Sequence, residues 1–171
     1  RTPDERIGDF NAQIAAIHTG QIRLNDLSIR YGTPSLHSHM SALLDYSHKL
    51  TLAALSSLPN GQFAFEDYIE DDGLGNEHLK IACTVTLSDG KATFDFSGTS
   101  GETQGCVNTP LAVTESAVLY AVRCIAGTEI HGNDGVRRAL SIQAPEGSLV
   151  NALPPRAVSG GNVETSQRIT D

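Results

Sequence analysis

The sequence contains no tryptophan and one methionine, and aromatic residues make up 5% of its 171 residues. Basic residues are also few, with 12 Lys and Arg against 20 Asp and Glu, which gives a formal net charge of −8. This excess of negative charge repels phosphate backbones and anionic lipids, so nucleic acid and membrane surfaces are poor partners. No apolar run approaches the roughly 20 residues that a membrane-spanning helix needs. The 39% of apolar residues is enough for the core of one domain.

Cysteine is scarce as well. Cys83, Cys106 and Cys124 are an odd number of thiols at wide spacing, without a CxxC pair or a zinc-finger arrangement of histidines. Cys83 and Cys124 stand in apolar stretches, so we predict that both are inert buried thiols, as is typical of a reducing cytosol.

Both ends of the sequence have the pattern of a helix start. Thr2, Pro3 and Glu5 match an N-cap, a first helical residue and a capping-box glutamate. At the other end, Asn162 is predicted to cap a helix that begins at Val163. A nine-residue helix at a free terminus is marginal in water unless it docks or continues. We therefore expect the chain to be a middle fragment of a longer polypeptide.

Two amphipathic helices are predicted in the first third of the chain. Apolar residues recur there at alternating spacings of three and four, first from Pro3 to about Tyr31 and then up to the Pro59-Asn60-Gly61 stop. Gly32 ends the first helix, and Thr33 with Pro34 is predicted to cap the second. Because the connection is so short, residues 2 to 58 are predicted to form an antiparallel helical hairpin.

After residue 61 the hydrophobic period changes from that of a helix to that of a strand. Three segments, around 63–67, 79–87 and 91–96, are predicted to form a β-meander. The second and third are joined by a Ser88-Asp89-Gly90 turn. Between the first two lies an acidic turn, EDDG at 70–73.

A polar, glycine-rich loop at 97–109 leads to a further helix. Thr109 is predicted as its N-cap, Pro110 as its first residue and Ala126 as its approximate end. Its predicted apolar face consists of Ala117, Val118, Ala121, Val122 and Ile125. A strand around 140–144 and a turning segment up to residue 155 follow.

These elements predict an α+β fold. Residues 1–60 form a long antiparallel helical hairpin, and residues 61–171 form an α+β section with a small antiparallel β-sheet and a packed helix.

Histidines and acidic residues raise the question of a metal site. His37 and His39 are two residues apart on a predicted helix, so their side chains point about 200° apart and cannot share one ion. The acidic cluster lacks the spacing of a calcium loop; it consists of Glu66, Asp67, Glu70, Asp71 and Asp72. Surface histidines and solvated carboxylates are the simpler interpretation, and we predict no metal site, although an autonomous metal hydrolase built on these residues stays an alternative.

Polar residues at two places are candidates for substrate chemistry. The loop SGTSGETQG offers hydroxyls and backbone amides to an anion but lacks the lysine of a P-loop; a solvent or interface loop is the alternative. In GGNVETSQR the glycines let the backbone approach a ligand, Glu164 can orient a ligand or act as a base, and Arg168 can pair with Glu164 one helical turn away. Alternatively, these residues form a tight turn and cap a helix packed on a partner. The predicted catalytic residues are Glu164, Asn108 and Arg168, and the predicted substrate-binding residues are Thr165, Gly160, Gly161, Asn162 and Thr99.

Six stretches, in order and without a large gap, resemble the hydantoinase B family. They are RTPDERIGDFNAQIAA at 1–16, LLDYSHKL at 43–50, FEDYIEDDG at 65–73, FDFSGTSGETQGCVN at 94–108, APEGSLVN at 144–151 and GGNVETSQRITD at 160–171. The family includes the B subunit of N-methylhydantoinase, the C-terminal half of 5-oxoprolinase and the metal-carrying subunit of acetone carboxylase. His48 and Cys106 are minor departures from its pattern.

The resemblance implies a cytoplasmic, ATP-dependent enzyme that opens a small cyclic amide, such as a hydantoin or 5-oxoproline, or, in the carboxylase branch, joins carbon dioxide to a ketone. It also implies a hetero-oligomer in which an A-type partner chain or domain binds ATP with Mg²⁺. The family's divalent metal is held by motifs that precede the part matched here, so no cofactor is expected on this segment and the isolated chain is expected to be inactive. We therefore expect the chain to shape the substrate pocket and subunit contacts, with a non-catalytic scaffold or oligomerisation domain as the rival interpretation.

Overall fold

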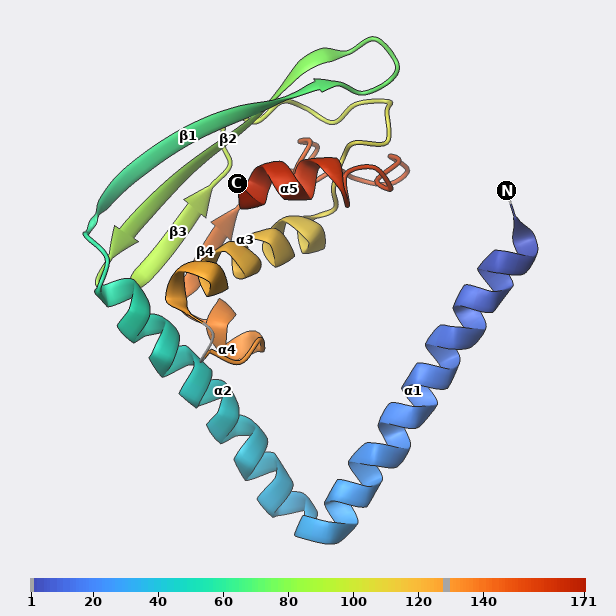
Figure 1. Ribbon diagram of the computed structural model, residues 1–171, viewed down its shortest axis with the longest axis vertical. Helices are drawn as coiled ribbons and strands as arrows, with labels where there is room; N and C mark the ends of the chain where they lie inside the picture. Colours follow the sequence, from blue (N-terminus) through green and yellow to red (C-terminus); the bar gives the residue numbers. More distant parts are fainter. Residues whose placement is uncertain (1, 128–129) are drawn as a thin grey trace. The chain divides into compact units, whose positions relative to one another are not determined.

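The computed structural model describes residues 2–127 and 130–171 and confirms the predicted α+β class (Figure 1). The elements are α1 (Pro3–Tyr31), α2 (Thr33–Ser56), β1 (Gly61–Asp71), β2 (Glu77–Ser88), β3 (Lys91–Asp95), α3 (Leu111–Ala126), α4 (Asp134–Arg137), β4 (Leu140–Gln143) and α5 (Glu164–Thr170). The chain divides into two compact units, Arg1–Leu43 and Leu44–Asp171. None of the helices in the described part of the chain combines the length and apolar character needed to cross a membrane.

The two long helices are confirmed, with Thr2 at the N-cap position of α1, Pro3 as its first residue and Gly32 after its end. The backbone of Thr2 is left-handed (φ 49°) and its side chain makes no capping hydrogen bond, so the predicted capping box does not form. Gly32 is the only residue between the helices, and its amide donates to the carbonyl oxygen of Ser28 (2.9 Å). Thr33 is therefore the first residue of α2 instead of its cap. The antiparallel packing of the two helices and the domain division at residue 60 stay predictions.

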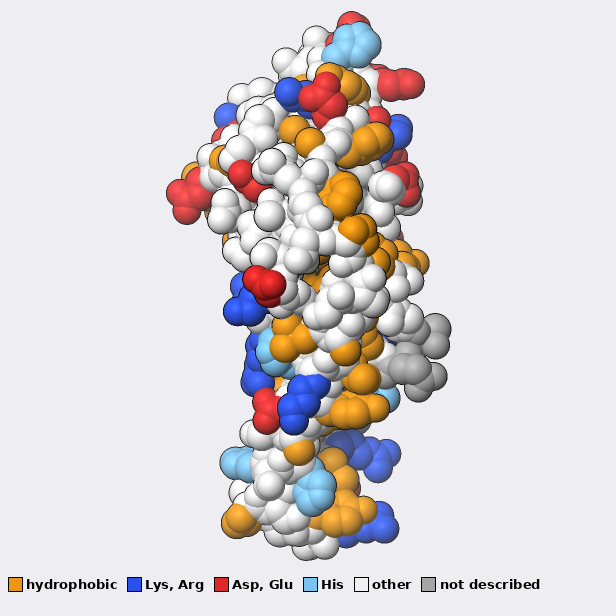
Figure 2. Space-filling model, turned by 90° about the vertical axis from the view of Figure 1, so that its left-hand side faces the viewer, with side chains coloured by type: hydrophobic (Ala, Val, Ile, Leu, Met, Phe, Trp, Pro, Cys, Tyr) orange, Lys and Arg blue, Asp and Glu red, His pale blue; other side chains and the backbone are white. Residues whose placement is uncertain are grey.

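No described residue of α1 is buried. Its predicted apolar stripe is exposed throughout, with Ile7 at 57%, Phe10 at 62%, Ile14 at 65%, Ile17 at 73%, Leu24 at 52% and Leu27 at 40%. Hydrophobic side chains also lie on the surface beside histidines in the helical part drawn at the bottom of Figure 2.

The predicted meander is confirmed as three antiparallel neighbours, β1, β2 and β3. Ser88 pairs with Lys91, which leaves Asp89 (φ 51°) and Gly90 (φ 75°) as a two-residue hairpin loop. Positive φ at both positions is typical of a type I′ turn, which matches the twist of the flanking strands. The acidic EDDG segment lies at the end of β1 and in the turn that follows, as predicted.

The sheet is mostly antiparallel, as predicted, and the fourth strand adds one parallel neighbour. β4 pairs with β3 in parallel, with Ile142 opposite Phe94. Two parallel neighbours need a long crossover connection, and here it contains α3 and α4. The strand itself is where the sequence predicts it, but its alternation carries no information about the direction of its neighbour.

The helices α3 and α5 cover one face of the sheet (Figure 1), and the main core lies between that face and the helices. Its most buried side chains come from the end of β3, from α3, from α4 and from the segment before α5; they are Phe96, Val118, Val122, Val136, Leu149 and Val150. Full burial of each such side chain contributes about 1.5–3 kcal/mol. A smaller cluster of Leu55, Ala92 and Ala139 packs the end of α2 on β3.

The start and the apolar face of α3 differ from the prediction. Pro110 is the N-cap and Leu111 the first helical residue. Thr109 is fully buried, and its hydroxyl donates to the carbonyl oxygen of Leu149 over 3.3 Å. The hydroxyl therefore bonds to the neighbouring segment and does not cap the helix. Ile125 is 63% exposed because the buried face of α3 ends with Val122.

Candidate functional site

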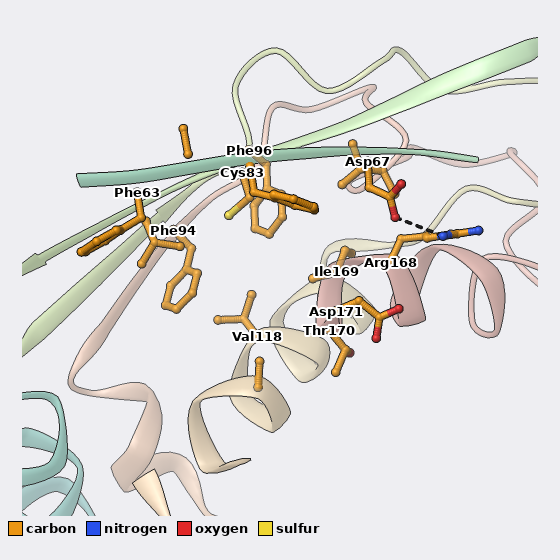
Figure 3. A pocket seen from close by; sticks show the side chains of 15 residues that line it. Phe63, Asp67, Cys83, Phe94, Phe96, Val118, Arg168, Ile169, Thr170 and Asp171 are labelled. Carbon is orange, nitrogen blue, oxygen red and sulfur yellow. Dashed lines mark hydrogen bonds and ion pairs between the residues drawn. The ribbon is translucent and has the colours of Figure 1, made fainter. Parts of the chain in front are cut away.

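A cavity of about 230 Å³ lies between the sheet and the helices α3 and α5 (Figure 3). Most of its wall is apolar and comes from alternate residues of three strands and from α3: Phe63, Phe65, Val85, Phe94, Phe96 and Val118. The strand register explains this grouping, because directly opposed residues share one face of a sheet. Phe65 is opposite Cys83, and Val85 lies between Phe63 and Phe94.

An ion pair lies at one end of the cavity. The guanidinium of Arg168 on α5 donates to the carboxylate of Asp67 on β1 over 3.1 Å, and the two side chains are 41% and 31% exposed. The predicted pairing of Arg168 with Glu164 is therefore wrong. Because α5 packs against β1, the strand presents a carboxylate to Arg168 from outside its own helix.

The cavity also contains the thiol of Cys83. Burial, and to a smaller extent the negative charge of Asp95, raises the pKa of this thiol to about 11, so it is protonated at neutral pH. The charged side chains of the lining are those of Asp67, Arg168 and Asp171. Cys124, predicted to be buried, is exposed on α3.

Asn108 holds the glycine-rich loop in place beside the core. It is fully buried; its Nδ2 donates to the carbonyl oxygens of Thr103 (3.2 Å), Gly105 (2.9 Å) and Ala157 (2.9 Å), and its Oδ1 accepts from the amide of Thr103 (2.7 Å). The side-chain amide thus joins the loop to the segment that leads to α5. A catalytic role for Asn108 stays a prediction.

The acidic turn after β1 is attached to the same loop through Asp72. Its buried carboxylate accepts from the side chain of Asn76 (2.7 Å), the amide of Leu74 (2.9 Å) and the amide of Gly105 (3.3 Å). The hydrogen bonds from Asn76, and after them the one from the amide of Leu74, hold the pKa of Asp72 well below its usual range. Across the loop, the hydrogen bond from Arg156 is the main cause of a lowered pKa for Glu102.

The glycine pair before α5 was predicted to let the backbone approach a ligand. In the structure, the backbone of Gly160 and Gly161 instead lies against the glycine-rich loop, at residues 106–108. The amides of Gly160 and Gly161 both donate to the carbonyl oxygen of Cys106 (2.8 and 2.9 Å). A Cβ on Gly161 would lie 2.0 Å from the carbonyl oxygen of Asn108, so only glycine fits there. Thr165 is fully buried and its hydroxyl donates to the carbonyl oxygen of Val107. Substrate binding by these residues stays a prediction.

The other predicted site residues lie apart from the cavity. Asn162 is exposed and is not the N-cap, because Val163 occupies that position and α5 begins at Glu164. Glu164 is exposed and, with Arg168, lines a second hollow between α5 and the end of β1. Thr99 both donates to and accepts from the backbone of Ala82 (3.1 Å each). Of the predicted residues, Arg168 alone lines the cavity.

Sequence reasoning missed Asp67 and the aromatic wall as parts of one site. The alternation placed Phe63 and Phe65 on one face of a strand, and Asp67 belongs to the same series. What brings them to Phe94 and Arg168 is the register of the sheet and the docking of α5.

No three His, Cys, Asp or Glu side chains are grouped to hold a metal ion within residues 2–127 and 130–171. His37 and His39 are exposed on α2. The acidic cluster is divided among separate partners, with Glu66 3.4 Å from Lys80 and Asp67 bound to Arg168. The described residues therefore do not fit the family's metal.

A model of the family described as hydantoinase B/oxoprolinase matches residues 1–171, so the chain belongs to this family. It is 34% identical to 5-oxoprolinase 1 of Arabidopsis thaliana, over 100% of this chain and 14% of that protein. The chain thus spans about a seventh of that relative's length.

Two solved structures share the fold. The crystal structure of an ATP-dependent caprolactamase from Pseudomonas jessenii superposes with a TM-score of 0.84 at 24% identity, over 97% of this chain and 29% of that chain. A nucleotide-free acetone carboxylase superposes with a TM-score of 0.70 at 15% identity, over 90% of this chain and 22% of that chain. At these identities the likeness concerns the fold alone.

Proposed function

We propose that this chain is part of the B-type subunit of a cytoplasmic, ATP-dependent enzyme that opens a small cyclic amide, such as a hydantoin or 5-oxoproline. In this proposal the segment supplies one wall of the substrate pocket and contacts to other subunits. Membership of the hydantoinase B/oxoprolinase family and the relation to a 5-oxoprolinase support the class of reaction.

The observation that carries the pocket role is the meeting of two family stretches at one cavity. Residues 65–73 supply Asp67 and residues 160–171 supply Arg168, and these two side chains form the ion pair at the cavity's end. A guanidinium offers several N–H donors in a fixed plane, which suits the oxygen of an amide or a carboxylate. Asp67 fixes the direction of that plane, so Arg168 can hold the substrate's amide oxygen while the apolar wall holds the rest.

The proposal assigns ATP with Mg²⁺ to an A-type partner chain or domain. When bound there, ATP supplies the phosphoryl group that activates the amide for opening. The glycine-rich loop of this chain lacks a P-loop lysine, and its Thr99 and Asn108 already bond to the chain's own backbone. This segment therefore contributes positioning, and none of its residues is assigned to phosphate.

The proposal is tested in the reconstituted enzyme with its A-type partner. Arg168→Ala should reduce ATP-dependent turnover of the cyclic amide about tenfold or more, because the substrate loses its positioning contact, while the size of the assembly stays the same. Arg138→Ala is the matched control, since Arg138 forms a comparable exposed ion pair with Asp45 (2.8 Å) and does not line the cavity. Unchanged turnover in Arg168→Ala would contradict the pocket role.

A scaffold or oligomerisation role is the second candidate, favoured by the exposed apolar stripe of α1. Glu164→Gln separates the two, because Glu164 is exposed on α5 beside Arg168. A loss of turnover in an intact assembly supports a pocket, whereas a loss of assembly supports the scaffold. Carbon dioxide consumption with a ketone would assign the chain to the carboxylase branch instead.

A further inference from the structure

We infer that the free edge of β1 pairs with an extended segment of a partner subunit, which continues the sheet and carries basic side chains beside the acidic half of β1. This inference rests on the proposed function and deepens it, because it assigns the contacts to other subunits to one strand edge and gives the chemistry of the segment that binds there.

β1 lies at one edge of the sheet and is long for an edge strand. The strand order is β1-β2-β3-β4, so β1 has β2 on one side and no strand of the described chain on the other (Figure 1). It has 11 residues, contains no proline and keeps one register with β2 from Gly61 to Asp71. Edge strands are usually short, bulged or covered, because their unpaired N–H and C=O groups can pair with another chain.

The free side of β1 belongs to its even-numbered residues. On β2, the backbone N–H and C=O groups of Lys80 and Ala82 bond to residues 99–100, which follow β3, and so point away from β1. Successive residues of a strand point these groups to opposite sides, so the odd-numbered residues of β2 bond to β1. Their register partners on β1 are also odd-numbered. The even-numbered residues within 62–70 therefore direct their backbone groups outward.

These outward groups are available for pairing. The amide of Tyr68 donates to the carboxylate of Asp67 (2.7 Å), which agrees with its outward direction. The backbone groups of Ala64, Glu66 and Glu70 make no hydrogen bond within the described part of the chain. An extended segment beside β1 would satisfy them, as in proteins that bind a peptide by strand addition.

The first half of β1 favours apolar side chains in the added strand. Phe63 and Phe65 are 49% and 71% exposed. Facing residues of neighbouring strands have their Cβ atoms about 4.5–5.5 Å apart, so a side chain beside each ring would cover part of it. Aromatic and β-branched side chains pair favourably with phenylalanine in this position.

The second half of β1 favours basic side chains. Glu70 and Asp71 are exposed, and together with Glu164 they line the second hollow. The guanidinium in this hollow, that of Arg168, is already bound to Asp67. A Lys or Arg of the added strand beside Glu70 would compensate the excess of negative charge.

A second copy of this chain does not fit the edge. The sequence of β1, GQFAFEDYIED, contains carboxylates but no Lys or Arg. Two such strands would bring their carboxylates together without a counter-charge, and like charges on adjacent strands are destabilising. The charge of β1 therefore selects a partner of different sequence.

The backbone pairing is tested in the reconstituted enzyme with its A-type partner. Ala64→Pro removes an outward amide, and proline is tolerated on an edge strand at such a position. The variant should fold but raise the subunit dissociation constant, measured by analytical ultracentrifugation, about tenfold or more, because the added strand loses its ladder there. Ala64→Val keeps the amide and is the matched control. An unchanged dissociation constant in folded Ala64→Pro would overturn the inference.

The charge preference is tested with Glu70→Lys, which leaves the backbone of β1 intact and therefore also serves if the proline variant does not fold. It should raise the same dissociation constant about tenfold and reduce its dependence on salt, because repulsion replaces attraction. Glu146→Lys makes the same change of charge at an exposed position after β4 and should have no effect. Association of Glu70→Lys as tight as that of the wild type would refute the charge complementarity.

The source of the strand is tested by carbodiimide cross-linking, which joins a carboxylate to a lysine amine in contact with it. Mass spectrometry should find the β1 peptide joined through Glu70 or Asp71 to a lysine of the partner subunit. A link to a lysine elsewhere in the same polypeptide would show that the subunit completes its own sheet, and the inference would be wrong.

Failure of this inference is distinguishable from failure of the proposed function. If Ala64→Pro assembles normally while Arg168→Ala loses turnover, the pocket role stands and the strand interface fails. If Ala64→Pro dissociates the subunits while Arg168→Ala leaves turnover unchanged, the interface stands and the pocket role fails.

Discussion

Arg168 on the last helix and Asp67 on the first strand form an ion pair of 3.1 Å although about a hundred residues separate them in the chain. The pair links α5 to the edge of the sheet at the end of an aromatic cavity. Each side chain is partly exposed, so the pair is better suited to orienting a guanidinium than to holding the fold together.

Asp67→Asn should therefore change the free energy of unfolding by no more than about 1 kcal/mol. A double-mutant cycle with Arg168→Ala, measured by urea unfolding, gives the coupling energy of the pair. Glu66→Gln with Lys80→Ala is a matched cycle, because that pair joins β1 to β2 over 3.4 Å and is similarly exposed. A coupling of several kcal/mol would show that the pair is a structural element.

Gly161→Ala should destabilise the protein by at least about 2 kcal/mol. The added Cβ would lie 2.0 Å from the carbonyl oxygen of Asn108, a backbone atom that cannot move aside alone. Gly101→Ala is the control, because its nearest neighbour would be 3.9 Å away. Chemical denaturation measures both, and equal midpoints would contradict the close approach.

Asn108→Ala should cost about 3 kcal/mol of stability, because it leaves the amide of Thr103 and the carbonyl oxygen of Ala157 buried without this partner. Thr165→Val tests the neighbouring contact and should cost about 1–3 kcal/mol, since it removes the hydroxyl bonded to Val107. Thr165→Ser retains that hydroxyl and serves as the control. If Asn108→Ala removed turnover with unchanged stability, Asn108 would act in catalysis and not in holding the loop.

The stability of the fold should fall in acid partly through Asp72. Its folded-state pKa lies below the ordinary value of 3.8, so the ionised carboxylate stabilises the fold above that pH and the contribution is lost as the pH falls through the folded-state pKa. Asp72→Asn should flatten the dependence of unfolding free energy on pH below about pH 4. Asp89→Asn, in the exposed hairpin turn, is the control. An unchanged acid limb in Asp72→Asn would contradict this role.

Thiol labelling of the native protein at pH 8 should show one slow cysteine. Cys83 is partly buried with its pKa raised to about 11, so only about one molecule in a thousand carries the reactive thiolate. Cys106 and Cys124 are exposed and should react faster. Identification of the labelled peptides by mass spectrometry checks the order, and in urea all three should react alike.

The sequence was sufficient to predict the elements that depend on local patterns. The change of period at residue 61 located the meander, and Asp89-Gly90 identified its hairpin turn because only residues tolerant of positive φ fit there. The parallel pairing of β4 was not predictable in this way, since its direction depends on how α3 and α4 cross the sheet.

For the site, too, the sequence predicted relations between residues close together in the chain but not contacts between distant ones. Arg168 was identified as a functional candidate, but its partner was assigned to Glu164 because helical spacing is the only neighbour relation that a single sequence states. Asp67 and Phe94 come to Arg168 through register and helix docking. The burial of Asn108 and Thr165 likewise follows from packing, which polar side chains in a glycine-rich stretch do not reveal.

The order of the elements has a consequence for synthesis on the ribosome. β1, β2 and β3 are consecutive neighbours joined by short turns, so they can pair soon after they emerge, whereas α5 is made only after α3, α4 and β4. Until α5 docks, the main core cluster lacks the part of its cover that Ile169 of this helix supplies. We expect this interval to be when the chain most needs a chaperone.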